Sequence, residues 1–94
     1  MIRSFGNGLA LDLFHRRRVK GIPDDIRRRA ERKLWLVDAA TSLEDLRSPP
    51  ADHLELLQGE LAGRHSIRIN DQWRIVFQWC NDGAHEVEVV DYHS

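Results

Sequence analysis

The sequence predicts an α+β domain in which an N-terminal helix hairpin packs on a small twisted antiparallel sheet. Residues 65–94 alternate between apolar and polar side chains, which is typical of strands, whereas residues 9–17 and 24–40 repeat their apolar positions at helical spacing. The chain has no internal repeat, low-complexity tract or domain boundary, and 94 residues suffice for one modest core. We therefore expect a single domain spanning residues 1–94.

Three consecutive strands are predicted at Ser66–Asn70, Trp73–Trp79 and Glu86–Val90. Asn70-Asp71-Gln72 is a turn between the first two strands, and the Asp-Gly pair within Asn81-Asp82-Gly83 favours a tight hairpin between the last two. One face of this sheet would bury aromatic and β-branched side chains in a core. The opposite face would present polar residues to solvent, namely Arg68, Arg74, Gln78 and Glu88.

The N-terminal third begins with a β-like segment, Ile2–Phe5, which we expect as an edge strand, followed by a short amphipathic helix over residues 9–17. Arg16-Arg17-Arg18 near the end of that helix would complement its dipole. A second helix starts near Pro23 and runs to about residue 40. Its apolar stripe comprises Ile26, Ala30, Leu34 and Val37, and its outward side chains are Arg27, Arg28, Glu31 and Arg32.

The middle of the chain is less regular. Thr41 and Glu44 have the spacing of a capping box before a single helical turn at Leu43–Leu46. The segments that follow are an irregular stretch with paired prolines (47–52), a strand or extended segment (53–57) and a loop (58–63).

The net charge of −1 conceals an asymmetry. Residues 1–36 hold ten Lys and Arg against four Asp and Glu, whereas residues 37–94 hold four against eleven. The basic run Arg16–Lys20 would either contact phosphates or form a solvated helix end. Because Cys80 is the single cysteine, no internal disulfide forms, and no apolar run reaches the roughly 20 residues of a membrane span. With no signal-peptide core at the start, we expect a cytoplasmic protein without a membrane partner.

The motifs also limit the chemistry. The five histidines and Cys80 show no close metal-ligand spacing, and we find no phosphate-cradling glycine loop or nucleophile-elbow serine. We therefore expect neither a metal nor a cofactor. The remaining side chains suit metal-free RNA cleavage, because RNA supplies its own nucleophile, the 2′-OH. The enzyme then needs a base, a cation on the phosphate and an acid for the leaving oxygen.

Arg68 and Arg74 are the candidates that would hold the phosphate. Residues near the chain end would act as acid, base or stacking groups, and the segment before the sheet would reach the same face. Packing of a strand-end tyrosine and an idle terminal histidine are the alternatives. The proton-handling candidates are Tyr92, His93, Glu55 and His53.

The whole chain resembles the HigB family of bacterial type II toxins, within the RelE/ParE superfamily. The resemblance is most specific in Gly63–Arg74 (GRHSIRINDQWR) and Val90–His93 (VDYH), and it includes Met1–Phe5, Leu36–Thr41 and Leu46–Pro50. It implies a RelE-like fold, mRNA cleavage on the ribosome and inhibition of translation. It also implies a HigA-like helix-turn-helix antitoxin, with operator DNA bound only through the toxin–antitoxin complex.

The resemblance also assigns roles to residues. Arg74 matches the phosphate-contacting arginine that follows tryptophan in the family, and Glu55 falls where some relatives carry a catalytic histidine. Asp91, Tyr92 and His93 match the C-terminal catalytic group.

The chain departs from the family in one triplet, Leu57-Gln58-Gly59, where many relatives have Leu-Lys-Gly. Gln58 donates hydrogen bonds but carries no charge, and a lost electrostatic contact of this kind costs about 10²-fold in rate. We therefore predict a weak toxin, or one in which another side chain near the RNA replaces the lysine. The candidates for that replacement are Arg64, His53 and His65.

The alternative is a non-nucleolytic module on the same fold. It would inhibit DNA gyrase, as the ParE branch does, or only bind an antitoxin and co-regulate transcription. Asp91, Tyr92, His93 and Arg74 favour the nuclease, whereas Gln58 favours the alternative. A small structural interaction domain is the third possibility.

Overall fold

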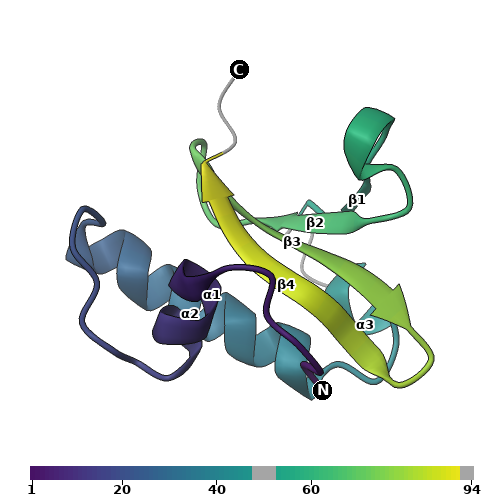
Figure 1. The fold of residues 1–94 in the computed structure, drawn as a ribbon, viewed down its shortest axis with the longest axis horizontal. Coiled ribbons are helices and arrows are strands. Elements are labelled where there is room, and N and C mark those ends of the chain that lie inside the picture. Colours follow the sequence, from purple (N-terminus) through teal and green to yellow (C-terminus); the bar gives the residue numbers. More distant parts are fainter. Residues whose placement is uncertain (48–52, 92–94) are drawn as a thin grey trace.

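The computed structural model describes residues 1–47 and 53–91. The strands form one antiparallel sheet in the order β1-β2-β3-β4. Helices α1 and α2 form a hairpin against one face of this twisted sheet (Figure 1), which confirms the predicted α+β architecture. The elements are α1 (Gly8–Phe14), α2 (Asp24–Ala39), α3 (Glu44–Arg47), β1 (Glu55–Leu56), η2 (Gly59–Leu61), β2 (His65–Arg68), β3 (Trp73–Cys80) and β4 (Gly83–Asp91).

The core lies between the helix hairpin and one face of the sheet. Helix α2 supplies Leu34 and Val37, and the strands supply Ile67, Ile75 and Phe77, all of them fully buried. The predicted alternation along the strands and the predicted apolar stripe of the second helix both follow this face. Within the described residues, no helix is long and apolar enough to cross a membrane.

The opposite face of the sheet is less exposed than the sequence predicts. Ser66 pairs in register with Val76. Both side chains are buried, although they lie on the same face as Arg68 and Arg74, which the sequence predicts to meet solvent. Leu57, whose amide donates to the Arg64 carbonyl, is also buried. The prediction that this face is open to solvent is therefore wrong at Ser66 and Val76, because Ser66 Oγ accepts from Arg74 Nε and the Arg64–Glu88 ion pair crosses the strand at Val76.

The N-terminal segment runs parallel to β4 (Figure 1). Its pairing is limited to isolated bridges from Ile2 to Ala84 and from Phe5 to Val87, so the predicted edge strand is present in a minimal form. The Ala84 amide donates to the Met1 carbonyl at 2.9 Å. The first residues of the chain therefore close the free edge of β4.

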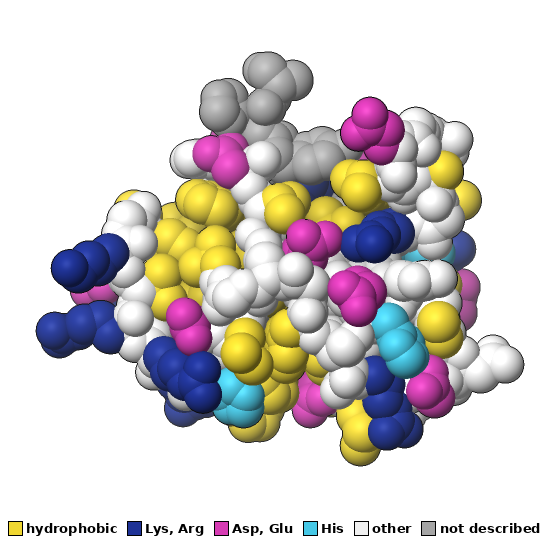
Figure 2. Space-filling view, viewed as in Figure 1, with side chains coloured by type: hydrophobic (Ala, Val, Ile, Leu, Met, Phe, Trp, Pro, Cys, Tyr) yellow, Lys and Arg dark blue, Asp and Glu magenta, His cyan; other side chains and the backbone are white. Residues whose placement is uncertain are grey.

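Helix α1 is shorter than predicted. Asn7 caps its start by accepting from the Ala10 amide, and the helix ends at Phe14. The basic run therefore lies beyond the helix instead of in its last turn. Arg16 adopts φ +57° and lies over the Trp35 ring, and Arg17 pairs with Asp12 at 3.1 Å. In the space-filling view, Lys and Arg side chains gather at the end of the molecule where the α1–α2 connection lies (Figure 2).

The turn before α3 is capped by a different carboxylate from the one predicted. Asp45 Oδ2 accepts from the Thr41 amide at 2.8 Å, the Thr41 hydroxyl at 3.0 Å and the Ser42 amide at 3.3 Å. These hydrogen bonds, led by the one from the Thr41 amide, lower the pKa of Asp45. The capping-box prediction with Glu44 is wrong, because α3 begins at Glu44 itself and leaves Asp45 facing back to the turn.

Candidate active site

Arg74 is held in one orientation by three groups from neighbouring segments. Its Nε donates to Ser66 Oγ at 3.0 Å, and its Nη2 donates to the His53 carbonyl at 3.0 Å. The same Nη2 lies 3.4 Å from Glu55 Oε1, and the Arg74 side chain is only 13% exposed. Because Ser66 is fully buried, this hydroxyl fixes the guanidinium from below. The structure thus brings the Arg74 guanidinium together with the Glu55 carboxylate and with the backbone carbonyl of His53.

Arg68 and Arg74 are direct cross-strand partners between β2 and β3, so both side chains start from the same face. Like charges in this position are unfavourable unless they are compensated. Arg68 is compensated by Asp71 in the turn, and Arg74 by Glu55. An anion bound between the two arginines would relieve the same repulsion, which is the electrostatic arrangement a phosphate site requires.

Arg64 belongs to this face through an ion pair that crosses β3. Its Nη1 lies 3.0 Å from Glu88 Oε2 on β4, with about 30% of each side chain exposed. Val76 pairs in register with both Ser66 and Glu88, so the ion pair passes close to Val76. Arg64 is therefore a third guanidinium on the face of Arg68 and Arg74, and it is held by the Glu88 carboxylate.

A groove of about 480 Å³ continues from this site towards α2. It shares His53 and Arg68 with the site, and Arg29 on α2 is fixed at its wall by donating to the Ile69 carbonyl at 3.3 Å. The groove lining carries more cations than carboxylates. It consists of Arg29, Arg32, Lys33, His53, Arg68, Ile69, Asn70 and Asp71.

The sequence interpretation did not include Arg29 or Lys33 in the site. The signal was their spacing with Arg32, because residues three and four apart share one face of a helix. Only the contact of Arg29 with Ile69 and the shared groove show that this face of α2 lies opposite the β2–β3 turn. Helical periodicity alone does not reveal which element lies opposite a basic face.

The other predicted site residues are placed as follows. Gln58 is exposed at the start of η2, where its side chain makes no capping hydrogen bond. Asp91 pairs in register with Trp73 and accepts from Gln72 Nε2 at 3.0 Å, so it starts from the face opposite to Arg74. Tyr92 and His93 lie outside the described residues.

His65 is directed to the core face rather than the Arg74 face. It pairs in register with Phe77, and its ring stacks on the Phe77 ring with centroids 6.2 Å apart. Burial, followed by the charge of Arg47, lowers the pKa of His65 from 6.5, so the ring is neutral at pH 7. A neutral ring on this face offers no positive charge to a phosphate, and we do not assign His65 to the RNA-binding set.

His65 should make the folded state sensitive to mild acid. The unfolded chain binds a proton near pH 6.5 more readily than the fold does, so stability is full above that pH and falls as the pH drops through it. In urea unfolding between pH 7.5 and 5.5, His65→Phe is expected to flatten this loss while keeping the stack on Phe77. His15→Gln, at an exposed position, is the control and should retain the native slope. An unchanged slope in His65→Phe would contradict the assignment.

Comparison with known proteins gives one consistent result. Residues 4–93 match the family model of the RelE-like toxin of type II toxin-antitoxin system HigB. The chain is 44% identical to Toxin HigB-1 of Vibrio cholerae over 78% of this chain and 76% of the relative. It is 35% identical to Endoribonuclease HigB of Proteus vulgaris over 99% and 100% of the two chains. The structure of the YoeB-YefM complex from Staphylococcus aureus matches with a TM-score of 0.61 and 20% identity, over 100% of this chain and 99% of that chain.

The fold is that of a RelE-like toxin. The family match covers nearly the whole chain, so the chain belongs to the HigB-like toxins of type II toxin-antitoxin systems. This confirms the family predicted from Gly63–Arg74 and the C-terminal motif. The structural match at low identity supports the same fold.

Proposed function

We propose that this toxin is an endoribonuclease that cleaves mRNA on the ribosome and thereby inhibits translation in the cytoplasm. The observation that carries the proposal is the Arg74 guanidinium, fixed by Ser66 and the His53 carbonyl beside the Glu55 carboxylate. The name of the Proteus vulgaris relative, Endoribonuclease HigB, supports the reaction class.

In this proposal Arg74 binds the scissile phosphate and stabilises the charge that develops on it. A base removes the proton of the 2′-OH, whose oxygen attacks phosphorus, while an acid protonates the departing 5′-oxygen. Glu55 is suited to act near the 2′-OH, because its carboxylate lies 3.4 Å from the guanidinium that holds the adjacent phosphate. Tyr92 and His93 stay candidates for the remaining proton transfer and for base stacking, whereas Asp91 starts from the face opposite to Arg74.

The groove beside Arg68 would hold the RNA backbone next to the cleaved bond. Arg29 and Arg32 from α2 would supply positive charge for contacts to phosphates. Positioning by the ribosome would add the orientation that so small a site cannot provide alone.

The test compares mRNA with and without ribosomes in a purified translation system. We expect cleavage only with ribosomes, giving fragments with a 2′,3′-cyclic phosphate. Cleavage of free mRNA at the same rate would contradict the dependence on ribosomes. An intact mRNA together with inhibited DNA gyrase would instead support the non-nucleolytic alternative.

As a type II toxin the chain has an antitoxin partner, and we propose that it is HigA-like with a helix-turn-helix domain. We therefore expect operator DNA to bind only the copurified complex, and a shift of operator DNA by the toxin alone would contradict this.

Gln58→Lys is expected to raise the cleavage rate, by up to about 10²-fold if position 58 limits activity. The added ammonium would lie at the start of η2, near β1 and its Glu55. Gln78→Lys is the matched control, because it makes the same charge change on β3 towards the hairpin end, at an exposed position. Single-turnover rates measure both variants. Equal rates for Gln58→Lys and the native chain would show that position 58 is not limiting.

A further inference from the structure

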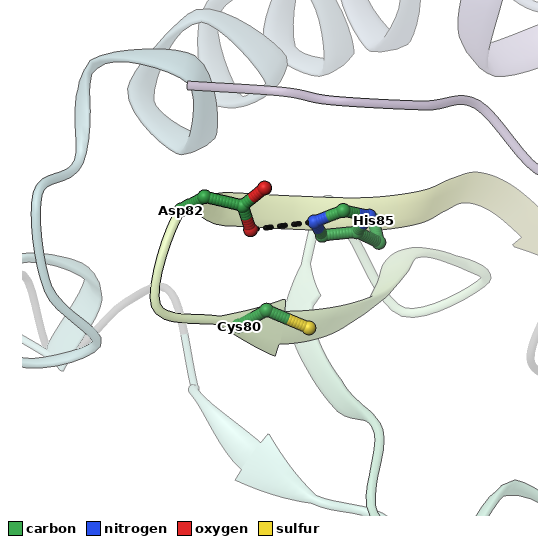
Figure 3. A group of neighbouring side chains, drawn as sticks. All are labelled: Cys80, Asp82 and His85. Atoms are coloured by element: carbon green, nitrogen blue, oxygen red, sulfur yellow. Dashed lines mark hydrogen bonds and ion pairs between the residues drawn. The ribbon is translucent and has the colours of Figure 1, made fainter.

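We propose that the tip of the β3–β4 hairpin is a binding site for a single thiophilic divalent cation of the zinc class. Its ligands would be Cys80, Asp82 and His85 (Figure 3). One ligand atom from each residue lies within 4.8 Å of the other two. Thiolate, imidazole and carboxylate are the donors that Zn²⁺ takes in proteins, with a water in the fourth position when the chain supplies three.

The strand register explains why these residues meet. Gln78 pairs with His85 and Cys80 pairs with Gly83, so His85 lies diagonally across from Cys80 on one face of the hairpin. Gly83 places no side chain opposite Cys80, and the His85 ring extends back towards the turn (Figure 3). Asp82 in the two-residue turn completes the group from above the strand ends. The hairpin thus brings together three side chains that have a Cys-x-Asp-x-x-His spacing in the sequence.

The side chains already have a geometry close to coordination. His85 Nε2 and Asp82 Oδ1 are 2.7 Å apart and share a proton in a hydrogen bond. Tetrahedral zinc holds such ligand atoms about 3.3 to 3.6 Å from one another. Entry of the metal therefore requires this pair to open by about half an ångström and Cys80 to move inwards. Binding through Nε2 leaves the ring proton on Nδ1 of a neutral His85, and the thiol proton of Cys80 passes to solvent.

Arg3 limits the freedom of Asp82 in the same cluster. Its Nε donates to the Asp82 carbonyl at 2.8 Å and lies 3.8 Å from Oδ2, which leaves Oδ1 for the cation side. The sequence-based expectation of no metal rested on the histidines and the cysteine alone, and left out Asp82, which lies between Cys80 and His85. Reading Cys80 and His85 together with Asp82 would have found the cluster.

The site would lie apart from the RNA-cleavage site. Arg74 and Cys80 are six residues apart on β3, about 20 Å at the rise of a strand. A cation at the tip would tie the turn to both strands and stabilise the fold that binds it. At 100 times its dissociation constant, the metal should raise the melting temperature by about 10 °C.

The experiment titrates the purified chain, freed of metal, with Co²⁺ and then Zn²⁺. The native chain should develop thiolate-to-cobalt charge-transfer absorption, and Zn²⁺ should abolish it at one equivalent while raising the melting temperature. Cys80→Ser should lose the band, and Asp82→Asn and His85→Ala should bind at least 10-fold more weakly. His15→Gln is the matched control and should behave like the native chain.

Two results would overturn the proposal. One is the absence of Co²⁺ absorption with no shift in melting temperature at millimolar Zn²⁺, and the other is a band that persists in Cys80→Ser. Circular dichroism checks that each variant is folded. The mRNA-cleavage assay tests the proposed nuclease independently of the metal site. A chelator should lower the melting temperature of the zinc-loaded chain but should not reduce mRNA cleavage at temperatures below the melting point.

Discussion

Replacing Arg74 with alanine is expected to lower the rate of ribosome-dependent mRNA cleavage by about 10²- to 10³-fold, the usual effect of removing one preorganised donor from a developing charge. The guanidinium is held by Ser66 and the His53 carbonyl before any substrate arrives, so little reorganisation is needed when phosphate binds. Single-turnover cleavage of one defined mRNA on purified ribosomes measures the effect.

Two further variants separate catalysis from folding. Arg74→Lys keeps the charge but cannot bond Ser66 and phosphate with one planar group, so an intermediate rate is expected. Arg47→Ala removes an arginine that is 63% exposed on α3 and pairs only loosely with Glu44, at 3.5 Å, and should leave the rate unchanged. Folding of each variant is checked by its melting curve. A folded Arg74→Ala variant that cleaves at the native rate would remove Arg74 from the mechanism.

The elements with strong local signals were the predictable part of the fold. The period-two pattern around Phe77 predicted β3, and the apolar stripe through Leu34 predicted the buried side of α2. Both signals arise within one element, so they need no knowledge of its neighbours. The burial of Ser66 and Val76 was not predictable in this way, because it depends on the Arg74 side chain and on the Arg64–Glu88 ion pair, which join separate strands.

The candidate site likewise contains residues that the sequence alone could identify and residues that depend on contacts between elements. Arg74 and Glu55 were identified from the sequence through a family resemblance, and the structure places them 3.4 Å apart. The groove residues on α2 were missed because their relation to the β2–β3 turn is a tertiary contact. His65 was grouped with Arg64 because the two are neighbours in the sequence. Adjacent residues of a strand point to opposite faces of the sheet, so His65 lies on the core face instead.

Gly83→Ala should be among the most destabilising single substitutions outside the core. Gly83 has φ +132°, which side chains rarely adopt, and an added Cβ would lie 2.1 Å from the Met1 carbonyl oxygen. Backbone strain of this kind costs about 1–3 kcal/mol, and displacing the N-terminal segment also breaks its pairing with β4. We expect a loss of about 3 kcal/mol, seen as a melting temperature lower by about 10–20 °C.

The matched control for this prediction is Gly8→Ala. Gly8 opens α1, and nothing lies within 4 Å of a Cβ added there. Since alanine favours helix and reduces the freedom of the unfolded chain, this variant should be as stable as the native protein or slightly more so. Equal melting temperatures for the two variants would mean that the N-terminal segment moves away from β4 at little cost. A large difference would show that the contact between Met1 and Gly83, 82 residues apart in the chain, contributes to global stability.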